Sequence, residues 1–205
     1  MQLTERQNDS LAELINIAFS RTAASLSEMT GHRVLLDVPQ VAIYPVNELA
    51  ARLGEFLPAE LASVHQVFTG PLTGDALLLL NYDGAVMLTD LLTDEVVKSR
   101  RLNESAREVL MEVGNILLNA CLGVFGNLLE VRVSFSVPRL HLETLGDLVK
   151  SLVIDKEELR YALVVYTAFR VRNSAISGFL VIALSVVSLD RLIQEVEYWE
   201  ERIGQ

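Results

Sequence analysis

The chain has 205 residues, a formal net charge of −10 at pH 7, and 51% hydrophobic residues. The acidic balance argues against nucleic acid or an anionic membrane as the main partner. No apolar run reaches the roughly 18 uninterrupted residues that a membrane-spanning helix needs. The first residues lack the basic and then apolar pattern of a signal peptide. We therefore expect a cytoplasmic protein without membrane insertion.

The chain has one cysteine and three histidines, and none of them has the spacing of a metal site. Cys121 lies in an apolar stretch, so we expect it to be buried as a small hydrophobic residue. His32, His65 and His141 are isolated from one another along the sequence. Glycine-rich phosphate loops and nucleophile elbows are also missing from the sequence. We expect neither a metal site nor a cofactor of the chain's own.

A long helix is predicted over residues 4–30. Thr4 is a suitable N-cap, and Gly31 supplies a C-terminal stop. The apolar side chains of its first half gather on one side of a helical wheel. They are Leu11, Leu14, Ile15 and Ala18.

The rest of the first half alternates between strand and helix signals. Pro39 is expected to separate two strands, because a residue without an N–H is tolerated at a strand edge or first position. Strands are predicted over 32–38, 40–45, 62–69 and 75–81, and helices over 47–53 and 82–92. A charged stretch over 93–101 is predicted to link the two halves.

The second half repeats this order. A long helix is predicted over 103–128, followed by two strands on either side of Pro138. An acidic and less regular segment is expected before a final hairpin, and Ser188 is expected to cap the last helix. The segments are strands at 131–137 and 139–144, the irregular segment at 145–159, hairpin strands at 160–172 and 176–187, and a helix to about 201.

These patterns predict an α+β fold, because hairpins give antiparallel pairs and the helices are segregated from the sheet. We expect one domain over 1–205 with an internal repeat, 1–93 and 102–205. The duplicated helix-strand-strand units would be related by a pseudo-two-fold axis, and one largely antiparallel sheet would carry two long exposed helices. An internal pseudo-dimer favours a monomer.

The strongest signal is a polar pattern that occurs twice, with the copies 99 positions apart. Positions i, i+4 and i+7 of a helix fall within about 60° of one another. Each copy therefore places three polar side chains on one helix stripe, opposite the apolar side. Each stripe is followed, after 22 residues, by a proline. The copies are Asp9, Glu13, Asn16 and Pro39, and Glu108, Glu112, Asn115 and Pro138.

Either stripe alone is typical of an ordinary solvated helix face. The neighbouring core residues differ between the copies, whereas Glu13 and Glu112, and likewise Asn16 and Asn115, are identical. Substitutions at exposed positions usually change stability by no more than about 0.5 kcal/mol, so identity there has little structural reason. The repetition therefore favours a functional site.

The spacing resembles the signature of the CheC/CheX/FliY phosphatases of bacterial chemotaxis, and the presence of two copies resembles the two-site, CheC-like type. The resemblance implies hydrolysis of the aspartyl phosphate on a CheY-like response regulator, with Mg²⁺ supplied by the regulator. It implies catalytic roles for Glu13, Asn16, Glu112 and Asn115. The supporting residues are Asp9, Glu108, Pro39 and Pro138.

Two positions differ from the family pattern. Glu108 stands where Asp or Ser is usual, and Ile15 stands where the second copy has the usual glycine, Gly114. We therefore rank the second site as the more active one. Hydrolysis of a phosphoryl group needs little covalent help from the protein, and an Asn amide can orient the attacking water without titrating. A neighbouring Glu can pair with a cation of the partner.

Two other functions remain open on the sequence. One is a non-catalytic module that docks on a response regulator or on a CheD-like deamidase. The other is a metabolic α+β domain whose acidic stripes are only surface. Release of inorganic phosphate from a phosphorylated regulator would separate the phosphatase from both.

Overall fold

The computed structural model describes residues 3–57, 60–70, 72–93, 101–128, 130, 132–154, 159–171 and 173–203. The predicted link over 93–101 therefore lies almost wholly outside the described residues. The helices are α1 (Glu5–Thr30), the 3-10 helix η1 (Val46–Glu48), α2 (Leu49–Leu53), α3 (Tyr82–Thr93), α4 (Glu104–Leu128), α5 (Leu145–Ile154) and α6 (Val186–Ile203). The strands are β1 (Val34–Leu36), β2 (Gln40–Pro45), β3 (Glu60–Thr69), β4 (Gly74–Asn81), β5 (Ser134–Phe135), β6 (Arg139–Thr144), β7 (Leu159–Val171) and β8 (Ser174–Ser185).

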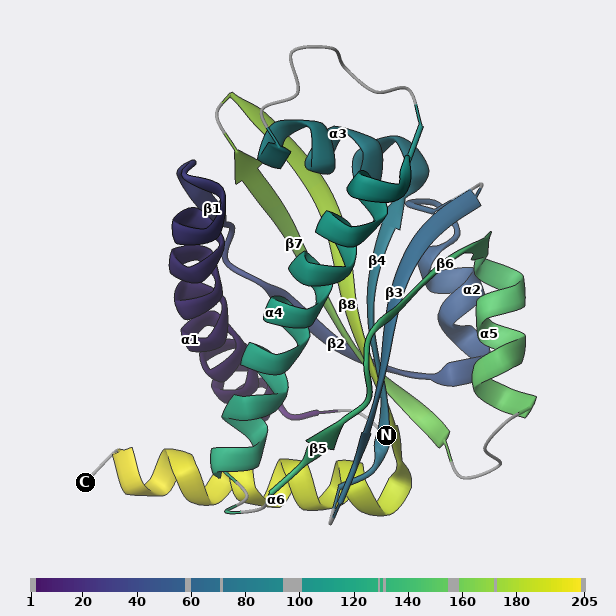
Figure 1. Cartoon of the computed structure of the whole chain (residues 1–205). Coiled ribbons are helices and arrows are strands. Elements are labelled where there is room, and N and C mark those ends of the chain that lie inside the picture. The colour runs from purple at the N-terminus through teal and green to yellow at the C-terminus, as the bar shows by residue number, and fades with distance from the viewer. Residues whose placement is uncertain are drawn as a thin grey trace.

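The strands form one curled antiparallel sheet (Figure 1). Its order is β1-β7-β8-β4-β3-β5, with β2 also paired to β7 and β6 also paired to β3. Both short strands of the first half thus lie along a long strand of the second half, and the reverse holds for β5 and β6. The predicted α+β class and the continuous sheet are confirmed. That the halves arose by duplication stays a prediction.

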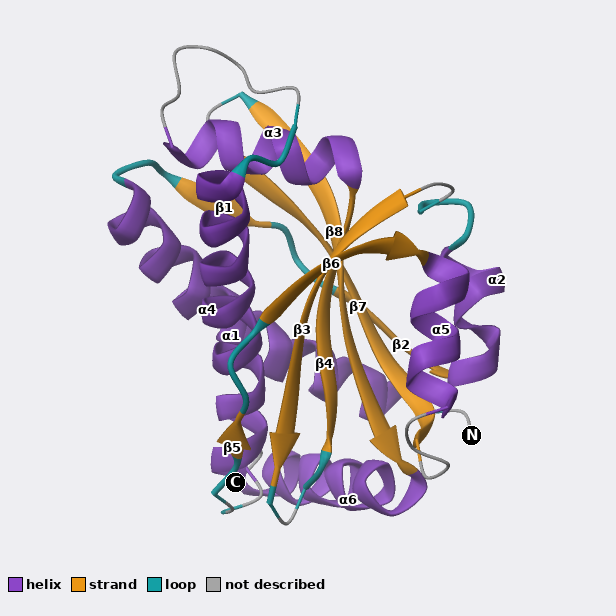
Figure 2. Ribbon diagram, turned by 45° about the vertical axis from the view of Figure 1, so that its right-hand side comes forward, coloured by secondary structure: helices purple, strands orange, loops and turns teal. Residues whose placement is uncertain are grey.

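Helices cover both faces of the sheet (Figure 2). Alternate residues of β4 point to opposite faces, as strand geometry requires. Leu78 and Leu80 join the core beneath α1, α3, α4 and α6. Leu77 and Leu79 join a second core beneath α2 and α5. The two long helices that carry the polar stripes therefore share one face, and the two short helices occupy the other.

The first helix begins and ends where the sequence predicts. Thr4 forms a capping box, in which its hydroxyl accepts from the Gln7 N–H at 3.2 Å and Gln7 Oε1 accepts from the Thr4 N–H at 2.8 Å. Gly31 ends the helix at φ 68°, a left-handed conformation that glycine adopts without strain. The predicted apolar side is buried, with Ile15 and Ala18 at 0% exposure.

The prediction of an irregular segment over 145–159 is wrong, because residues 145–154 form α5. Leu145, Leu148 and Leu152 are buried against the second face of the sheet, at the three-to-four-residue spacing of a helix. The Thr144 hydroxyl accepts from the Asp147 N–H at 3.2 Å and caps the helix start. The acidic residues that suggested irregularity include this first-turn Asp147, which a helix N-terminus favours.

The predicted cap of the last helix is also wrong. Helix α6 begins at Val186, and the Ser185 hydroxyl accepts from the Ser188 N–H at 3.1 Å. Ser185 is therefore the cap, and Ser188 lies in the first turn. Ser185 and Ser188 both belong to a residue type that is favoured at helix N-caps.

One described helix, Glu104–Asn127 of α4, is long and apolar enough to span a membrane by length and composition. Half of its most apolar stretch is buried inside the fold. Leu110, Val113 and Leu117 are among the buried residues and belong to the core beneath α1, α3, α4 and α6. The apolar character of α4 is accounted for by this contact with the sheet.

Candidate functional site

Pro39 lies at an irregularity between β1 and β2. Leu36 pairs with Phe169, and Gln40 pairs with Tyr166, so three residues, 37–39, oppose two residues of β7. The extra residue makes a one-residue β-bulge, which bends the strand and leaves one residue outside the ladder. A proline fits there because no ladder hydrogen bond needs its missing N–H. Pro39 itself is buried.

Pro138 lies at a matching bulge between β5 and β6. Phe135 pairs with Phe68, and Arg139 pairs with His65, so residues 136–138 oppose two residues of β3. The two bulges have the same length and the same position of the proline. The prolines therefore mark where each edge strand is interrupted, in agreement with the sequence-based prediction of a break at each one.

A buried side chain fixes each bulge from the neighbouring long strand. Thr167 Oγ1 donates to the Asp37 carbonyl at 3.0 Å, and Gln66 Nε2 donates to the Ser136 carbonyl at 2.9 Å. Thr167 and Gln66 are each only 2% exposed. Both bulges are thereby held in one conformation from beneath.

The residue that each bulge displaces is an exposed valine. Val38 is 77% exposed and Val137 is 80% exposed, and each directly precedes the proline of its copy. Few apolar side chains in the described chain are as exposed. A bulge re-aims side chains in this way next to functional sites in many sheets.

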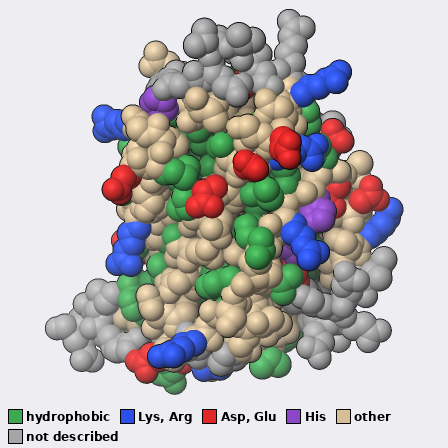
Figure 3. All heavy atoms as spheres, viewed as in Figure 1, with side chains coloured by type: hydrophobic (Ala, Val, Ile, Leu, Met, Phe, Trp, Pro, Cys, Tyr) green, Lys and Arg blue, Asp and Glu red, His purple; other side chains and the backbone are tan. Residues whose placement is uncertain are grey.

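The polar stripes lie on α1 and α4 but do not point straight into solvent. Asp9, Glu13, Glu108 and Glu112 are exposed, whereas Asn16 and Asn115 are only partly exposed. Figure 3 shows acidic side chains scattered over the face that carries α1 and α4. Each stripe thus runs from an exposed carboxylate to a half-buried amide.

Asn115 is braced by two neighbouring amides. Asn119 Nδ2 donates to Asn115 Oδ1 at 2.8 Å, and Gln66 Nε2 lies 3.5 Å from the same oxygen. Gln66 therefore connects Asn115 to the Ser136 carbonyl of the bulge. No side chain in the described ranges accepts a hydrogen bond from Asn115 Nδ2. The oxygen of the amide is held by the fold, and its two N–H donors have no hydrogen-bond acceptor in the described part of the chain.

Asn16 lacks this bracing. Its carbonyl accepts from the Ser20 hydroxyl at 2.9 Å, and its side-chain amide has no hydrogen-bond partner in the part of the chain that the structure describes. The position before each Asn differs as well. Gly114 lets α4 lie directly on β3, where a Cβ would meet Val64 Cγ1 at 2.5 Å, whereas Ile15 is itself a buried core residue.

The described residues contain no group of three His, Cys, Asp or Glu side chains arranged to hold a metal ion. The site residues assembled so far are amides, carboxylates, prolines and a buried hydrogen-bond network. Such a set can position a water or a partner's side chain, and it offers no nucleophile of its own.

Comparison with known proteins supports the family that the spacing resembles. The chain is 24% identical over 170 residues to the CheY-P phosphatase CheC of Bacillus subtilis, covering 81% of each protein. It is 22% identical over 142 residues to the flagellar motor switch phosphatase FliY of the same organism, covering 68% of this chain but only 36% of FliY. The chain thus spans about a third of that relative. No protein-family model matches.

Solved structures share the fold. The crystal structure of Thermotoga maritima FliY superposes with a TM-score of 0.74 at 20% identity, covering 97% of this chain and 99% of that one. The FliM middle domain from H. pylori superposes with a TM-score of 0.68 at 12% identity, covering 94% of this chain and 99% of that one. The chain is thus similar in sequence to CheC and FliY and shares the fold of FliY.

Within this CheC-like chain, the two copies of the site differ in charge at the bulge. Asp37 accepts two hydrogen bonds from the Arg170 guanidinium, from Nε at 2.5 Å and from Nη2 at 2.8 Å. This pair lowers the pKa of the Asp37 carboxyl and raises that of Arg170. The corresponding bulge residue of the second copy is Ser136, which is uncharged.

The sequence did not reveal the residues beneath the CheC-like stripes. Gln66 and Thr167 occupy matching places but differ in type. They are 101 positions apart rather than 99, so the repeat gives no signal for them. A buried polar residue in an apolar strand was the only available hint. The roles of the eight predicted site residues stay predictions.

Proposed function

We propose that the chain is a phosphatase that hydrolyses the aspartyl phosphate of a CheY-like response regulator. The CheC and FliY relatives are named as phosphatases, and CheC as acting on CheY-P, which supports a phosphatase role here. The observation that carries the proposal is the braced amide of Asn115. Its oxygen is held by Asn119 and Gln66 while its donors are free, one helical turn from the exposed carboxylate of Glu112.

In the proposed reaction, water attacks the phosphorus in line, the bond to the aspartyl oxygen breaks, and inorganic phosphate leaves. Phosphoryl transfer of this kind needs positioning and charge stabilisation more than covalent help. Asn115, and Asn16 at the first site, orient the water. Glu112 and Glu13 pair with a cation of the regulator and fix its docking. The Mg²⁺ and the phosphorylated Asp belong to the regulator.

The test is release of inorganic phosphate from a phosphorylated regulator. The double substitution Asn16→Ala and Asn115→Ala is expected to abolish the acceleration. The single substitution Asn115→Ala is expected to cost more than Asn16→Ala, because only the second amide is braced. Asn47→Ala, an exposed asparagine on η1, is the matched control. Unchanged release by the double variant would refute the mechanism.

A second candidate function is a non-catalytic module that binds a response regulator or a CheD-like deamidase. It is favoured by a chain of a FliG–FliM complex from H. pylori, which has this fold. The fold therefore serves binding in at least one protein. Stable association with phosphorylated regulator, without phosphate release, would support the module over the phosphatase.

The proposal also includes a cytoplasmic location and a monomeric state. The regulator would be a cytoplasmic signalling protein, and the relatives are chemotaxis and flagellar-switch proteins. The continuous sheet already joins the two halves across β4 and β8, so a second chain is not needed to complete it. Sedimentation equilibrium of the purified chain tests the monomer directly.

A further inference from the structure

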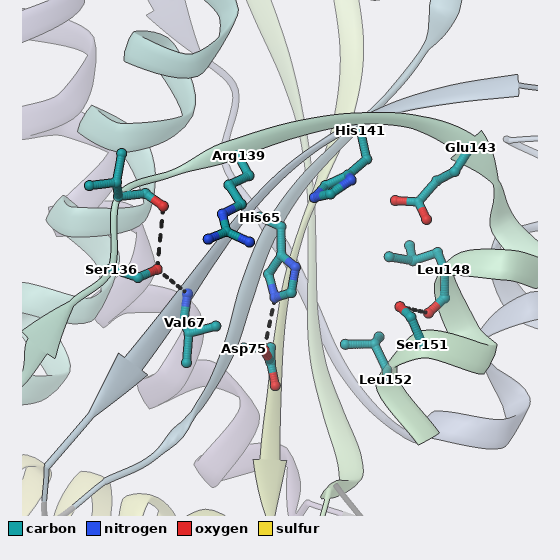
Figure 4. Close-up of a pocket in the computed structure, with 11 residues that line it drawn as sticks. His65, Val67, Asp75, Ser136, Arg139, His141, Glu143, Leu148, Ser151 and Leu152 are labelled. Carbon is teal, nitrogen blue, oxygen red and sulfur yellow. Dashed lines mark hydrogen bonds and ion pairs between the residues drawn. The ribbon is translucent and has the colours of Figure 1, made fainter. Parts of the chain in front are cut away.

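A pocket of about 570 Å³ lies between the sheet and α5 (Figure 4). Its polar lining comes from β3, β4, β6, α5 and the bulge between β5 and β6, and the apolar walls come from Val67, Val137, Leu148 and Leu152. The α5 face is opposite the one that carries α1 and α4, and the volume suits a small molecule. The polar side chains are His65, Asp75, Ser136, Arg139, His141, Glu143 and Ser151.

The two carboxylates of this pocket, Asp75 and Glu143, already have hydrogen-bond partners within the protein. His65 Nε2 and Asp75 Oδ1 lie 2.8 Å apart, and the Asp75 carboxylate is only 4% exposed. The buried Ser63 hydroxyl donates to Glu143 Oε1. Each carboxylate therefore has a hydrogen-bonding partner at one of its oxygens.

Two cationic or ring donors of the pocket, Arg139 and His141, are not engaged in this way. Across the described ranges, no hydrogen bond or ion pair is formed by the Arg139 guanidinium or by the His141 imidazole. Figure 4 shows Arg139 and His141 on either side of His65, and the two histidine rings lie 6.3 Å apart. A guanidinium is always charged and favours carboxylate and phosphate oxygens. The free donors of Arg139 and His141 therefore suit a ligand that carries a negatively charged hydrogen-bond acceptor.

The other end of the same sheet provides an internal comparison. Asp75 pairs with Val67, two residues beyond His65, and Ser177 pairs with Ala168, two residues beyond Tyr166. Tyr166 and Ser177 thus repeat the diagonal arrangement of His65 and Asp75. Their hydroxyls lie 3.0 Å apart, where the first pair has a histidine and a carboxylate.

At that end the space is occupied by aromatic rings. Phe56 lies 6.1 Å from Tyr166 and 5.6 Å from Phe179, measured between ring centroids. Phe179 is buried, whereas Phe56 is 56% exposed and covers it from the solvent side. The fold therefore fills this region with aromatic side chains at one end of the sheet and leaves it polar and open at the other. At the pocket, the corresponding positions instead hold the paired His65 and Asp75 side chains, and the space beside them is open.

We infer that this pocket binds a small organic molecule that carries one anionic group, a phosphate or a carboxylate. The anionic group contacts Arg139 and His141 beside His65. Hydroxyl or ammonium donors of the ligand reach the Glu143 carboxylate, and the carbon skeleton lies against Leu148 and Leu152. Ser136 and Val137 of the second bulge also line the pocket, so it borders the proposed second site, but Glu13, Asn16, Glu112 and Asn115 are not among its lining residues.

The test is calorimetric titration of the full chain with two probes, glucose 6-phosphate for the phosphate class and L-glutamate for the carboxylate class. Glucose is the neutral control. Binding of either anion, without binding of glucose, is expected. Arg139→Gln is expected to weaken that binding about tenfold or more, because a hydrogen bond to a charged group is lost. Arg33→Gln, at an exposed arginine between α1 and β1, is the charge-matched control.

A second variant gives the pocket end of the sheet the residues that the Tyr166 end has. His65→Tyr with Asp75→Ser copies the Tyr166 and Ser177 pair and is expected to abolish anion binding. Circular dichroism shows whether this double variant folds, and Arg139→Gln at the exposed position carries the test if it does not. Failure of both anions to bind, or equal binding by the Arg139→Gln and Arg33→Gln chains, would overturn the inference.

Discussion

Gly114 of α4 rests on Val64 of β3 so closely that a Cβ on the glycine would lie 2.5 Å from Val64 Cγ1 and 2.8 Å from its Cβ. The nearer contacts include the branch point of the valine, which cannot swing away. Gly114→Ala is therefore expected to push α4 off the sheet, because overfilling a close contact strains its neighbours.

Gly123 of the same helix is the matched control, since a Cβ there would meet nothing within 4 Å. Gly123→Ala should gain the helix propensity that alanine offers, about 1 kcal/mol. Both changes gain this propensity, so their difference isolates the contact with Val64. Urea unfolding should show Gly114→Ala to be about 1–3 kcal/mol less stable than Gly123→Ala. Equal stabilities would show that α4 adjusts without strain.

Most of the fold could be predicted because its signals are local. Thr4 and Gly31 bound α1 by capping chemistry, and Pro39 and Pro138 mark the breaks between edge strands. Helix α5 differs from the sequence-based prediction of an irregular segment, because acidic residues obscure its apolar helical spacing. Its three buried leucines are meaningful only against the sheet face that they cover.

The candidate site was only half predictable, for a similar reason. The stripes follow from helix spacing, so Glu112 and Asn115 could be placed on one side of α4. The neighbours that hold Asn115 come from elsewhere in the chain, and Gln66 lies 49 positions away. A hydrogen bond between distant segments leaves no periodic signal. The sequence shows a glycine at position 114, but it does not show that this glycine contacts Val64.

Gln66 is expected to act as a positioning residue for the second site. Gln66→Leu removes the donor shared by Asn115 and the Ser136 carbonyl. The expected result is a several-fold lower kcat for phosphate release with little change in KM, because the regulator still docks. Thr167→Val removes the matching bond at the first bulge and should affect release less. A larger effect of Thr167→Val would indicate that the first site dominates.

The ion pair of Asp37 and Arg170 predicts a pH-dependent stability. The pair lowers the pKa of Asp37 below its ordinary value of 3.8. A depressed pKa stabilises the fold above the ordinary value, and the stabilisation is lost as the pH falls through the folded-state value. Asp37→Asn should therefore be less stable than the parent chain near neutral pH, and the difference should shrink below about pH 4.

Thermal unfolding at several pH values measures this difference. High salt should reduce it, since the pair is at the surface. Arg170→Gln should give the same pH dependence, because it removes the other partner of the same pair. A difference that persists unchanged in acid would assign the effect to something other than the carboxylate.

Cys121 is expected to be unreactive in the folded chain. The side chain is completely buried, and burial raises the pKa of its thiol far above the ordinary value. The thiolate is the reactive form, so iodoacetamide at about pH 8 should leave the native protein unmodified. Unfolding in guanidinium chloride should expose the thiol and allow complete modification, which mass spectrometry detects. Rapid modification of the native chain would contradict the buried position.

The exposed valines of the two bulges are expected to contact the regulator. Val137 follows Ser136, whose carbonyl shares the Gln66 amide with Asn115, so the valine is one residue from the network that braces this amide. Val38 has the same place at the first bulge. Rigid apolar side chains next to a polar site are suited to a protein interface, where they lose little entropy on binding.

Val38→Asp with Val137→Asp should therefore raise the KM for phosphorylated regulator about tenfold, the equivalent of about 1.4 kcal/mol. The kcat should stay near that of the parent chain, because Asn16 and Asn115 are untouched. Stability should change little at these exposed positions. Val187→Asp, at 77% exposure on α6, is the control for adding an exposed charge. If Val187→Asp raises KM as much as the double change, the bulges have no special part in docking, and the effect is one of net charge.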